Sequence, residues 1–205
     1  MVRSVHSLAF ALLRTAAEEE LRLITGAEQD AVIRELLIGQ AEDGHGSWPE
    51  EMRPALEYVG FARQLRDFLL RSIERGLGPG DLERLGHEYG RPMWSAAGEF
   101  LREYERVQLL SRSHSYSAAE LVTAVLQRPE LLRDHPFHTI VVDDAQLLDP
   151  TAGKLILGLA AQANLVVVGG DTAQSVFAFR GASSRFLQDF PAEHDTVSYT
   201  HLRAH

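Results

Sequence analysis

Two short apolar runs in this sequence each end on residues that could carry chemistry. Asp143 and Asp144 directly follow the run at residues 140–142, and a glycine turn with Asp171 follows the run at residues 165–168. Short β-branched runs that end on acidic or glycine residues are typical of buried parallel strands. Because ligands of open α/β sheets bind outside the carboxyl ends of the strands, we expect a phosphate and magnesium site there.

The residues after the second run strengthen this interpretation. An amide, two aromatic rings and an arginine follow the glycine turn closely: Gln174, Phe177, Phe179 and Arg180. Packing alone hardly explains this combination. The acid pair would by itself be a weak signal, because adjacent acids at strand ends also serve as helix caps and turn formers.

The two acids are expected to have different roles. Adjacent residues in an extended strand point to opposite sides of the backbone. One carboxylate could therefore hold a water-ligated magnesium ion while the other faces the water that attacks the phosphate.

Composition narrows the class of protein. The 205 residues are 45% hydrophobic, which is enough for one large domain or two small ones, and no run is long and apolar enough for a membrane span or a signal peptide. Without cysteine there is no disulfide framework and no thiolate metal site, which fits a cytoplasmic protein. The net charge of −9 argues against a protein that coats nucleic acid, so any contact with DNA must be a local groove.

The sequence has a single lysine, and it does not belong to a phosphate-binding loop. Such a loop needs two glycines at fixed spacing, then lysine and a hydroxyl residue. Lys154 is followed by Leu155, and Leu148 stands where the first glycine would be.

The pattern of apolar residues predicts α/β architecture with a helical block inside it. An apolar stripe through Leu8 and Leu12 predicts a first helix after a polar start. Helices are then predicted at residues 28–38, 49–58, 61–75, 81–89, 92–110, 118–127, 151–162 and 183–189, with glycine breaks at 39–46 and 76–80. Strands are predicted at 140–142, 165–168 and near Thr196, so helices and strands alternate after residue 117.

Three segments resemble helicase motifs. IVVDDAQ resembles motif II and GGDTAQSVFAFRGA resembles motif III of superfamily 1A DNA helicases of the UvrD, Rep and PcrA type, and RSVHSLAFALLR looks like motif Ib. The sequence VDDAQ and the arginine-rich composition look most like those of actinobacterial members, including subunits of AdnAB-type helicase–nucleases. The resemblance implies an internal fragment of an ATP-dependent helicase that uses ATP and Mg²⁺.

The resemblance also implies a domain division. Residues 1–19 and 117–198 would form part of the RecA-like P-loop motor domain 1A, a parallel sheet with helices. Residues 20–116 would form the inserted, all-helical 1B subdomain. Residues 199–205 do not match the family, and we expect them to be a truncation scar, just as we expect Met1 not to be the natural start of the fold.

Each site residue has a role by resemblance. Asp143 would organise magnesium, Asp144 would replace the glutamate base, Gln174 would sense the γ-phosphate, and Arg180 would link nucleotide to DNA. Phe177 and Phe179 would stack on single-strand bases, while Ser4 and His6 would contact the DNA backbone. By spacing alone, a helix-start role for His6 is equally compatible.

Departures from the family leave two functions open. Asp144 is one methylene shorter than glutamate, and a misplaced base can cost about a hundredfold in rate. The phosphate-binding loop, motif Ia and everything from motif IV onward are missing, so we expect this fragment alone to be inactive.

The resemblance leads us to expect part of a helicase that moves on single-stranded DNA and unwinds duplex junctions in repair or recombination. The complete motor would include a second RecA-like domain. The alternative is a catalytically weakened auxiliary subunit of a helicase–nuclease complex, and a nucleotide-binding module without a DNA role is disfavoured by the aromatic pair.

Overall fold

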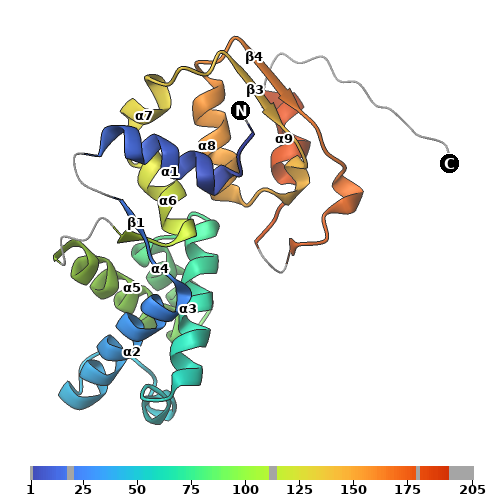
Figure 1. The fold of residues 1–205 in the computed structure, drawn as a ribbon. Helices are drawn as coiled ribbons and strands as arrows, with labels where there is room; N and C mark the ends of the chain where they lie inside the picture. The colour runs from blue at the N-terminus through green and yellow to red at the C-terminus, as the bar shows by residue number, and fades with distance from the viewer. Residues whose placement is uncertain (1, 18–20, 111–114, 179–180, 194–205) are drawn as a thin grey trace.

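The computed structural model describes residues 2–17, 21–110, 115–178 and 181–193. This part of the chain is mostly helical, with two small parallel sheets. Figure 1 shows two groups of elements, one made of the helices between residues 26 and 110 and the other made of the first helix and the chain after residue 117.

The first group is a helical block with its own core. Its elements are α2 (Gly26–Asp43), the 3₁₀ helix η1 (Glu50–Ala55), α3 (Val59–Glu74), α4 (Pro79–Glu88) and α5 (Pro92–Leu110). Buried side chains from these elements pack together, with Ile33, Leu65, Phe100 and Tyr104 among them. All residues of this core lie between positions 33 and 104.

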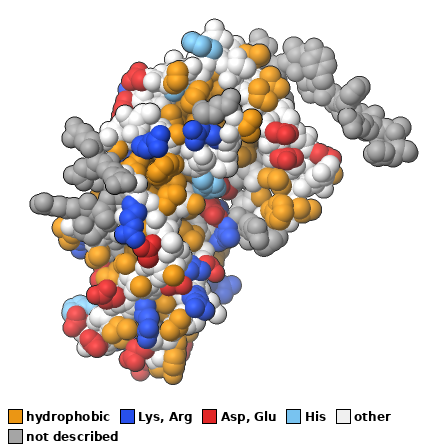
Figure 2. Space-filling view, in the orientation of Figure 1, with side chains coloured by type: hydrophobic (Ala, Val, Ile, Leu, Met, Phe, Trp, Pro, Cys, Tyr) orange, Lys and Arg blue, Asp and Glu red, His pale blue; other side chains and the backbone are white. Residues whose placement is uncertain are grey.

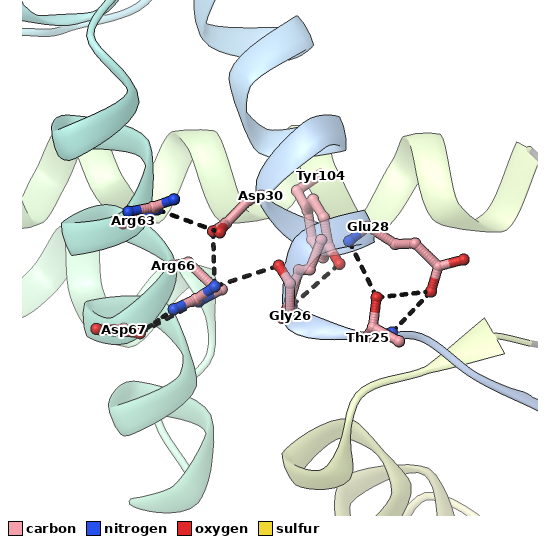
Figure 3. Close-up of polar contacts among 9 residues, drawn as sticks. Thr25, Gly26, Glu28, Asp30, Arg63, Arg66, Asp67 and Tyr104 are labelled. Atoms are coloured by element: carbon pink, nitrogen blue, oxygen red, sulfur yellow. Dashed lines mark hydrogen bonds and ion pairs between the residues drawn. The ribbon is translucent and has the colours of Figure 1, made fainter.

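Polar contacts fix the start of α2 against α3 (Figure 3). Thr25 and Glu28 form a reciprocal capping box, in which each side chain accepts the other residue's backbone N–H. Arg66 of α3 donates to the backbone oxygen of Gly26 at 3.2 Å and to Asp30 at 2.8 Å. The guanidinium therefore ties the two helices together at the entry to the block.

The second group surrounds the strands that carry the predicted site. It comprises α1 (Val5–Ala16), α6 (Ala118–Leu126), α7 (Pro129–Arg133), β3 (Thr139–Val142), α8 (Pro150–Ala160), β4 (Leu165–Val168) and α9 (Arg185–Glu193). Its main core unites α1, α6 and α8 through residues such as Leu13, Val125 and Leu155. The N-terminal helix thus packs with the chain that follows the helical block.

The two chain segments that connect the groups lie side by side. β1 (Arg22–Leu23) pairs in parallel with β2 (Ser115–Tyr116), and Ile24 N–H donates to the backbone oxygen of Tyr116 at 3.1 Å. The chain therefore enters and leaves the helical block at neighbouring points.

β3 and β4 form the expected parallel pair, but they are less buried than predicted. Residue 139 is in register with 165 and residue 142 with 168. Only Val142 is fully buried, whereas Val141 is 70% exposed and Leu165 and Val167 are also exposed. In the described chain the second face of this two-stranded sheet has no covering layer, and this explains the difference.

Two helix predictions were wrong in detail. α2 continues through Gly39 to Asp43 and stops at Gly44, which has a left-handed φ of +67°. A glycine inside a helix costs only about 1 kcal/mol, so position 39 does not break it. The segment predicted as a helix at 49–58 contains Pro54 and forms only the 3₁₀ helix η1. The strand predicted near Thr196 and the tail at 199–205 lie outside the described residues.

The surface is mixed in charge. On the face shown in Figure 2, basic and acidic side chains are interspersed over the helical block. No helix in the described part of the chain combines the length and apolar character that a membrane crossing requires.

Candidate functional site

The carboxyl ends of β3 and β4 meet at one edge, as the sequence predicts. Gly169 N–H donates to the backbone oxygen of Val142 at 2.8 Å, and Ala145 N–H donates to that of Gly169 at 3.0 Å. These two bonds extend the strand pair into the following turns. They place Asp143 and Asp144 beside the turn that leads to Asp171.

The acid pair does not keep the extended backbone that the sequence argument assumed. Asp144 has φ +52° and ψ +41°, the only left-handed backbone among the described residues other than glycine. The alternation of an extended strand therefore ends at Asp143. Asp143 Oδ1 accepts the N–H of Asp144 at 2.9 Å, and both side chains are exposed. Aspartate tolerates this conformation better than most residues because its short polar side chain bonds locally.

Gln146 links the two halves of the site, and sequence reasoning missed it. It is 2% exposed, and its amide nitrogen donates to Asp144 Oδ1 at 3.2 Å. Its amide oxygen accepts the N–H of Asp171 at 3.1 Å, and its backbone oxygen accepts the hydroxyl of Ser175 at 3.4 Å. Gln146 is the last residue of the IVVDDAQ segment, but it was assigned no role from the sequence.

Gly170 allows this link. A methyl group at position 170 would lie 2.4 Å from Gln146 Oε1 and 2.9 Å from Leu187. Only a residue without a side chain leaves room for the amide of Gln146 between the two turns.

Gln174 lies on the same edge but bonds within its own turn. Asp171 starts the 3₁₀ helix η3 (Thr172–Gln174), where its carboxylate accepts Ala173 N–H at 2.9 Å and the Gln174 amide at 3.0 Å. The Gln174 side chain is exposed, so its amide is accessible to a ligand at this edge.

The helical conformation ends at Gln174. Phe177 is 39% exposed, and the chain returns to the body of the protein through Gly181. Phe179 and Arg180 lie outside the described residues.

Ser4 and His6 lie at the start of α1. Ser4 Oγ accepts Ser7 N–H at 3.3 Å, which makes Ser4 the N-cap of the helix. His6 is half-buried in the first turn of α1. In the described chain Ser4 thus also has a structural role.

The site offers carboxylates but no closed metal cage. The described residues contain no group of three or more histidine, aspartate or glutamate side chains able to enclose a metal ion. A magnesium ion at Asp143 would therefore take its other ligands from water and phosphate, which is its usual preference. The exposed Lys154 lies on α8. Its Nζ would lie 3.1 Å from a methyl group placed at Gly76, at the end of α3.

Comparison with known proteins gives the family of this chain. The model of the UvrD/REP helicase N-terminal domain matches residues 1–195, and the chain belongs to this family.

Individual relatives agree with this assignment. DNA helicase II of Escherichia coli is 25% identical over 205 residues, which are 93% of this chain and 26% of that protein. DNA helicase II of Haemophilus influenzae is 26% identical over 208 residues, with 94% and 26% covered. YjcD of Bacillus subtilis is 28% identical over 110 residues, with 50% and 14% covered. The chain thus spans about a quarter or less of the length of these relatives.

Proposed function

We propose that this chain is part of an ATP-dependent DNA helicase motor, in which ATP hydrolysis drives movement along single-stranded DNA and opening of duplex junctions. The observation that carries the proposal is the strand edge, where Gln146 ties Asp144 to the turn of Asp171 and Gln174. Membership of the UvrD/REP family supports it, as do the names of the relatives. The setting would be DNA repair or recombination in the cytoplasm.

We also propose a division of the chain into two domains. Residues 1–19 and 117–198 would be part of motor domain 1A, and residues 20–116 would be its helical 1B insertion. The separate cores of the two groups and the adjacent strands β1 and β2 support this division. A second RecA-like domain of the complete protein would close the ATP site.

The resemblance to helicase motifs supports a role for each site residue. Asp143 would hold Mg²⁺ together with water and phosphate oxygens, and Asp144 would orient the attacking water. Gln174 would contact the γ-phosphate, and Arg180 would link the nucleotide to DNA. Phe177 and Phe179 would stack on bases, and Ser4 and His6 would contact the DNA backbone.

A second function is favoured by one observation. Asp144 replaces the longer glutamate and has a left-handed backbone, a combination that suits a pocket with weakened hydrolysis. The chain would then belong to an auxiliary motor subunit, of the kind found in actinobacterial AdnAB-like helicase–nucleases. Catalytic rate rather than DNA binding separates the two functions.

The test measures ATP hydrolysis by the complete protein with and without single-stranded DNA. For the motor we expect DNA-stimulated turnover that Asp143→Ala abolishes, because the magnesium ligand is lost. Asp134→Ala, an exposed acid at the end of α7, serves as the matched control and should leave the rate unchanged. DNA binding without turnover would favour the auxiliary subunit. The absence of both DNA binding and turnover would contradict both functions.

A further inference from the structure

The end of α3 is built to meet the second group of elements. Gly76 has φ +74°, Gly76 N–H donates to the backbone oxygen of Ile73 at 2.8 Å, and Leu77 N–H donates to that of Ser72 at 2.9 Å. This is a Schellman termination. It turns the chain away and leaves the last carbonyl groups of the helix facing α8.

Thr151 makes the connection. Its hydroxyl lies 2.9 Å from the backbone oxygen of Ile73 and 2.8 Å from that of Glu74, and its side chain is buried. Thr151 belongs to the first turn of α8, which Asp149 caps through Ala152 N–H at 2.8 Å. The helix between β3 and β4 is therefore fastened to the end of α3.

Gly181, which follows Gln174 and Phe177 in the sequence, also lies at the end of α3. Gly181 is buried with φ +89°, and a methyl group there would lie 2.9 Å from Glu74 Oε2 and 3.7 Å from Arg71 Nη1. Gly181 N–H donates to the backbone oxygen of Ala178 at 3.1 Å. The turn therefore packs directly on an ion pair of the helical block.

The ion pair occupies a costly position. Arg71 and Glu74 pair within the last turn of α3, and the Glu74 side chain is only 20% exposed. Burial raises the pKa of Glu74, the charge of Arg71 offsets part of this rise, and the nearby Asp149 adds to it. Such a pair is weak evidence for a stabilising role, because the desolvation of the carboxylate opposes its pairing.

We propose that Arg71 and Glu74 are positioning residues, which hold the Gly181 turn against α3 so that the helical block sets the position of the segment carrying Gln174 and Phe177. The contact itself stands on the geometry above. Only the consequence for ATP and DNA rests on the proposed function.

Hydrogen exchange of this chain tests the contact. The reporters are the amides of Gly181, Ala182 and Ser183, which donate to the backbone oxygens of residues 178, 177 and 148. Glu74→Gln should speed their exchange about tenfold while the melting temperature stays within about 1 °C, since the neutral side chain suits the buried position. Glu88→Gln breaks a surface pair with Arg84 and is the matched control, with no change at the reporters.

A second pair of variants keeps the test decisive if Glu74→Gln alters the fold. Gly181→Ala and Gly90→Ala both place alanine at positive φ, but only position 181 meets a neighbour. We expect faster reporter exchange in the first variant only. We also expect a non-additive result when it is combined with Glu74→Ala, because both changes alter the same contact between position 181 and Glu74. Unchanged reporter exchange in Glu74→Gln and Gly181→Ala would overturn the proposal, as would an equal rise at all amides.

The consequence for ATP hydrolysis is measured in the complete motor. There Glu74→Gln should reduce the stimulation of kcat by single-stranded DNA several-fold while the basal rate and the KM for ATP remain unchanged. Full stimulation in this variant would overturn the coupling role. If the unaltered motor hydrolyses no ATP, the proposed function fails, whereas the exchange measurement still decides whether the pair positions the turn.

Discussion

The amide oxygen of Gln146 accepts the backbone N–H of Asp171 at 3.1 Å. This bond joins the turn after β3 to the turn after β4, and the same side chain holds Asp144 through its amide nitrogen. A buried side chain that bridges both turns fixes the distance between the acid pair and the η3 helix.

Gln146→Leu should therefore destabilise the protein although it preserves the volume of the side chain. The change leaves Asp171 N–H without its acceptor in a part-buried hydrogen bond, so the loss should lie near the lower end of the about 1–3 kcal/mol that an unsatisfied buried donor costs. For a chain of this size each kcal/mol lowers the melting temperature by roughly 2–4 °C. Thermal melting measures the effect, with the exposed Gln162→Leu as control. Equal melting temperatures for both variants would show that the bridge carries no stability.

Asp144→Glu should preserve or raise ATP hydrolysis in the complete motor, because the longer side chain restores the reach of the base. The structure adds a cost: glutamate suits the left-handed backbone less well than aspartate, so the melting temperature should fall by about 1–3 °C. Asp144→Asn is the control that keeps the backbone but removes the base, and it should lower the rate by about 100-fold or more. A large loss of rate in Asp144→Glu would mean that the pocket is built around aspartate.

The 205-residue chain by itself should hydrolyse no ATP above background. It contains the acid pair and Gln174, but its only lysine lies on α8 near Gly76 rather than in a glycine-rich phosphate loop. A phosphate-release assay with Mg²⁺ checks this. Turnover by the pure chain that Asp143→Ala abolishes would contradict it.

Local patterns were enough to predict the elements that carry the site. α5 begins and ends as expected, and the two apolar runs form the parallel pair β3 and β4. Periodicity and strand composition depend on neighbouring residues, so one sequence contains them. The short strands β1 and β2 were missed because each has two residues, too few for any pattern.

The geometry of the site was harder to foresee, because it depends on contacts between distant residues. The left-handed Asp144 allows Gln146 to reach the Asp171 turn, and the space at Gly170 admits its amide. Neither feature follows from the spacing of the acids. The same holds for Glu74 and Gly181, which lie far apart in sequence and meet only in the folded chain.

Tyr104 should make stability depend on alkaline pH. Its hydroxyl accepts hydrogen bonds from Gln29 at 3.2 Å and Gln108 at 2.8 Å, and the ring lies beside the first turn of α2 (Figure 3). Burial, with the negative charge of Glu120, raises the pKa of Tyr104 from 10.0 to about 12. The folded state thus disfavours the phenolate.

The direction of the pH dependence follows from the linkage between protonation of Tyr104 and folding. The contribution of Tyr104 is fully present below pH 10, the ordinary pKa, and is lost as the pH rises from 10 to about 12. Urea unfolding at pH 8 and pH 11.5 should show a loss that is smaller in Tyr104→Phe by about 1–2 kcal/mol. An identical loss in both proteins would show that Tyr104 ionises freely in the folded state.

The aromatic residues after Gln174 provide the last prediction. A ring that stacks on a base contributes about 1–3 kcal/mol to single-strand binding, whereas a buried phenylalanine contributes about 3–5 kcal/mol to folding. Phe177 is 39% exposed and follows the end of η3, while Phe179 precedes the arginine and the Gly181 turn. In the complete motor, Phe179→Ala should therefore weaken single-strand binding about 10-fold or more and uncouple ATP hydrolysis from DNA, with a nearly unchanged melting temperature. We expect Phe177→Ala to have the same kind of effect.

Phe100→Ala is the contrasting control, because Phe100 is fully buried in the core of the helical block. It should lower the melting temperature by roughly 6 °C or more. Fluorescence anisotropy with a labelled oligonucleotide measures binding, and calorimetry measures melting. A drop of several degrees in Phe179→Ala with DNA affinity intact would show that this ring packs in the fold and stacks on no base.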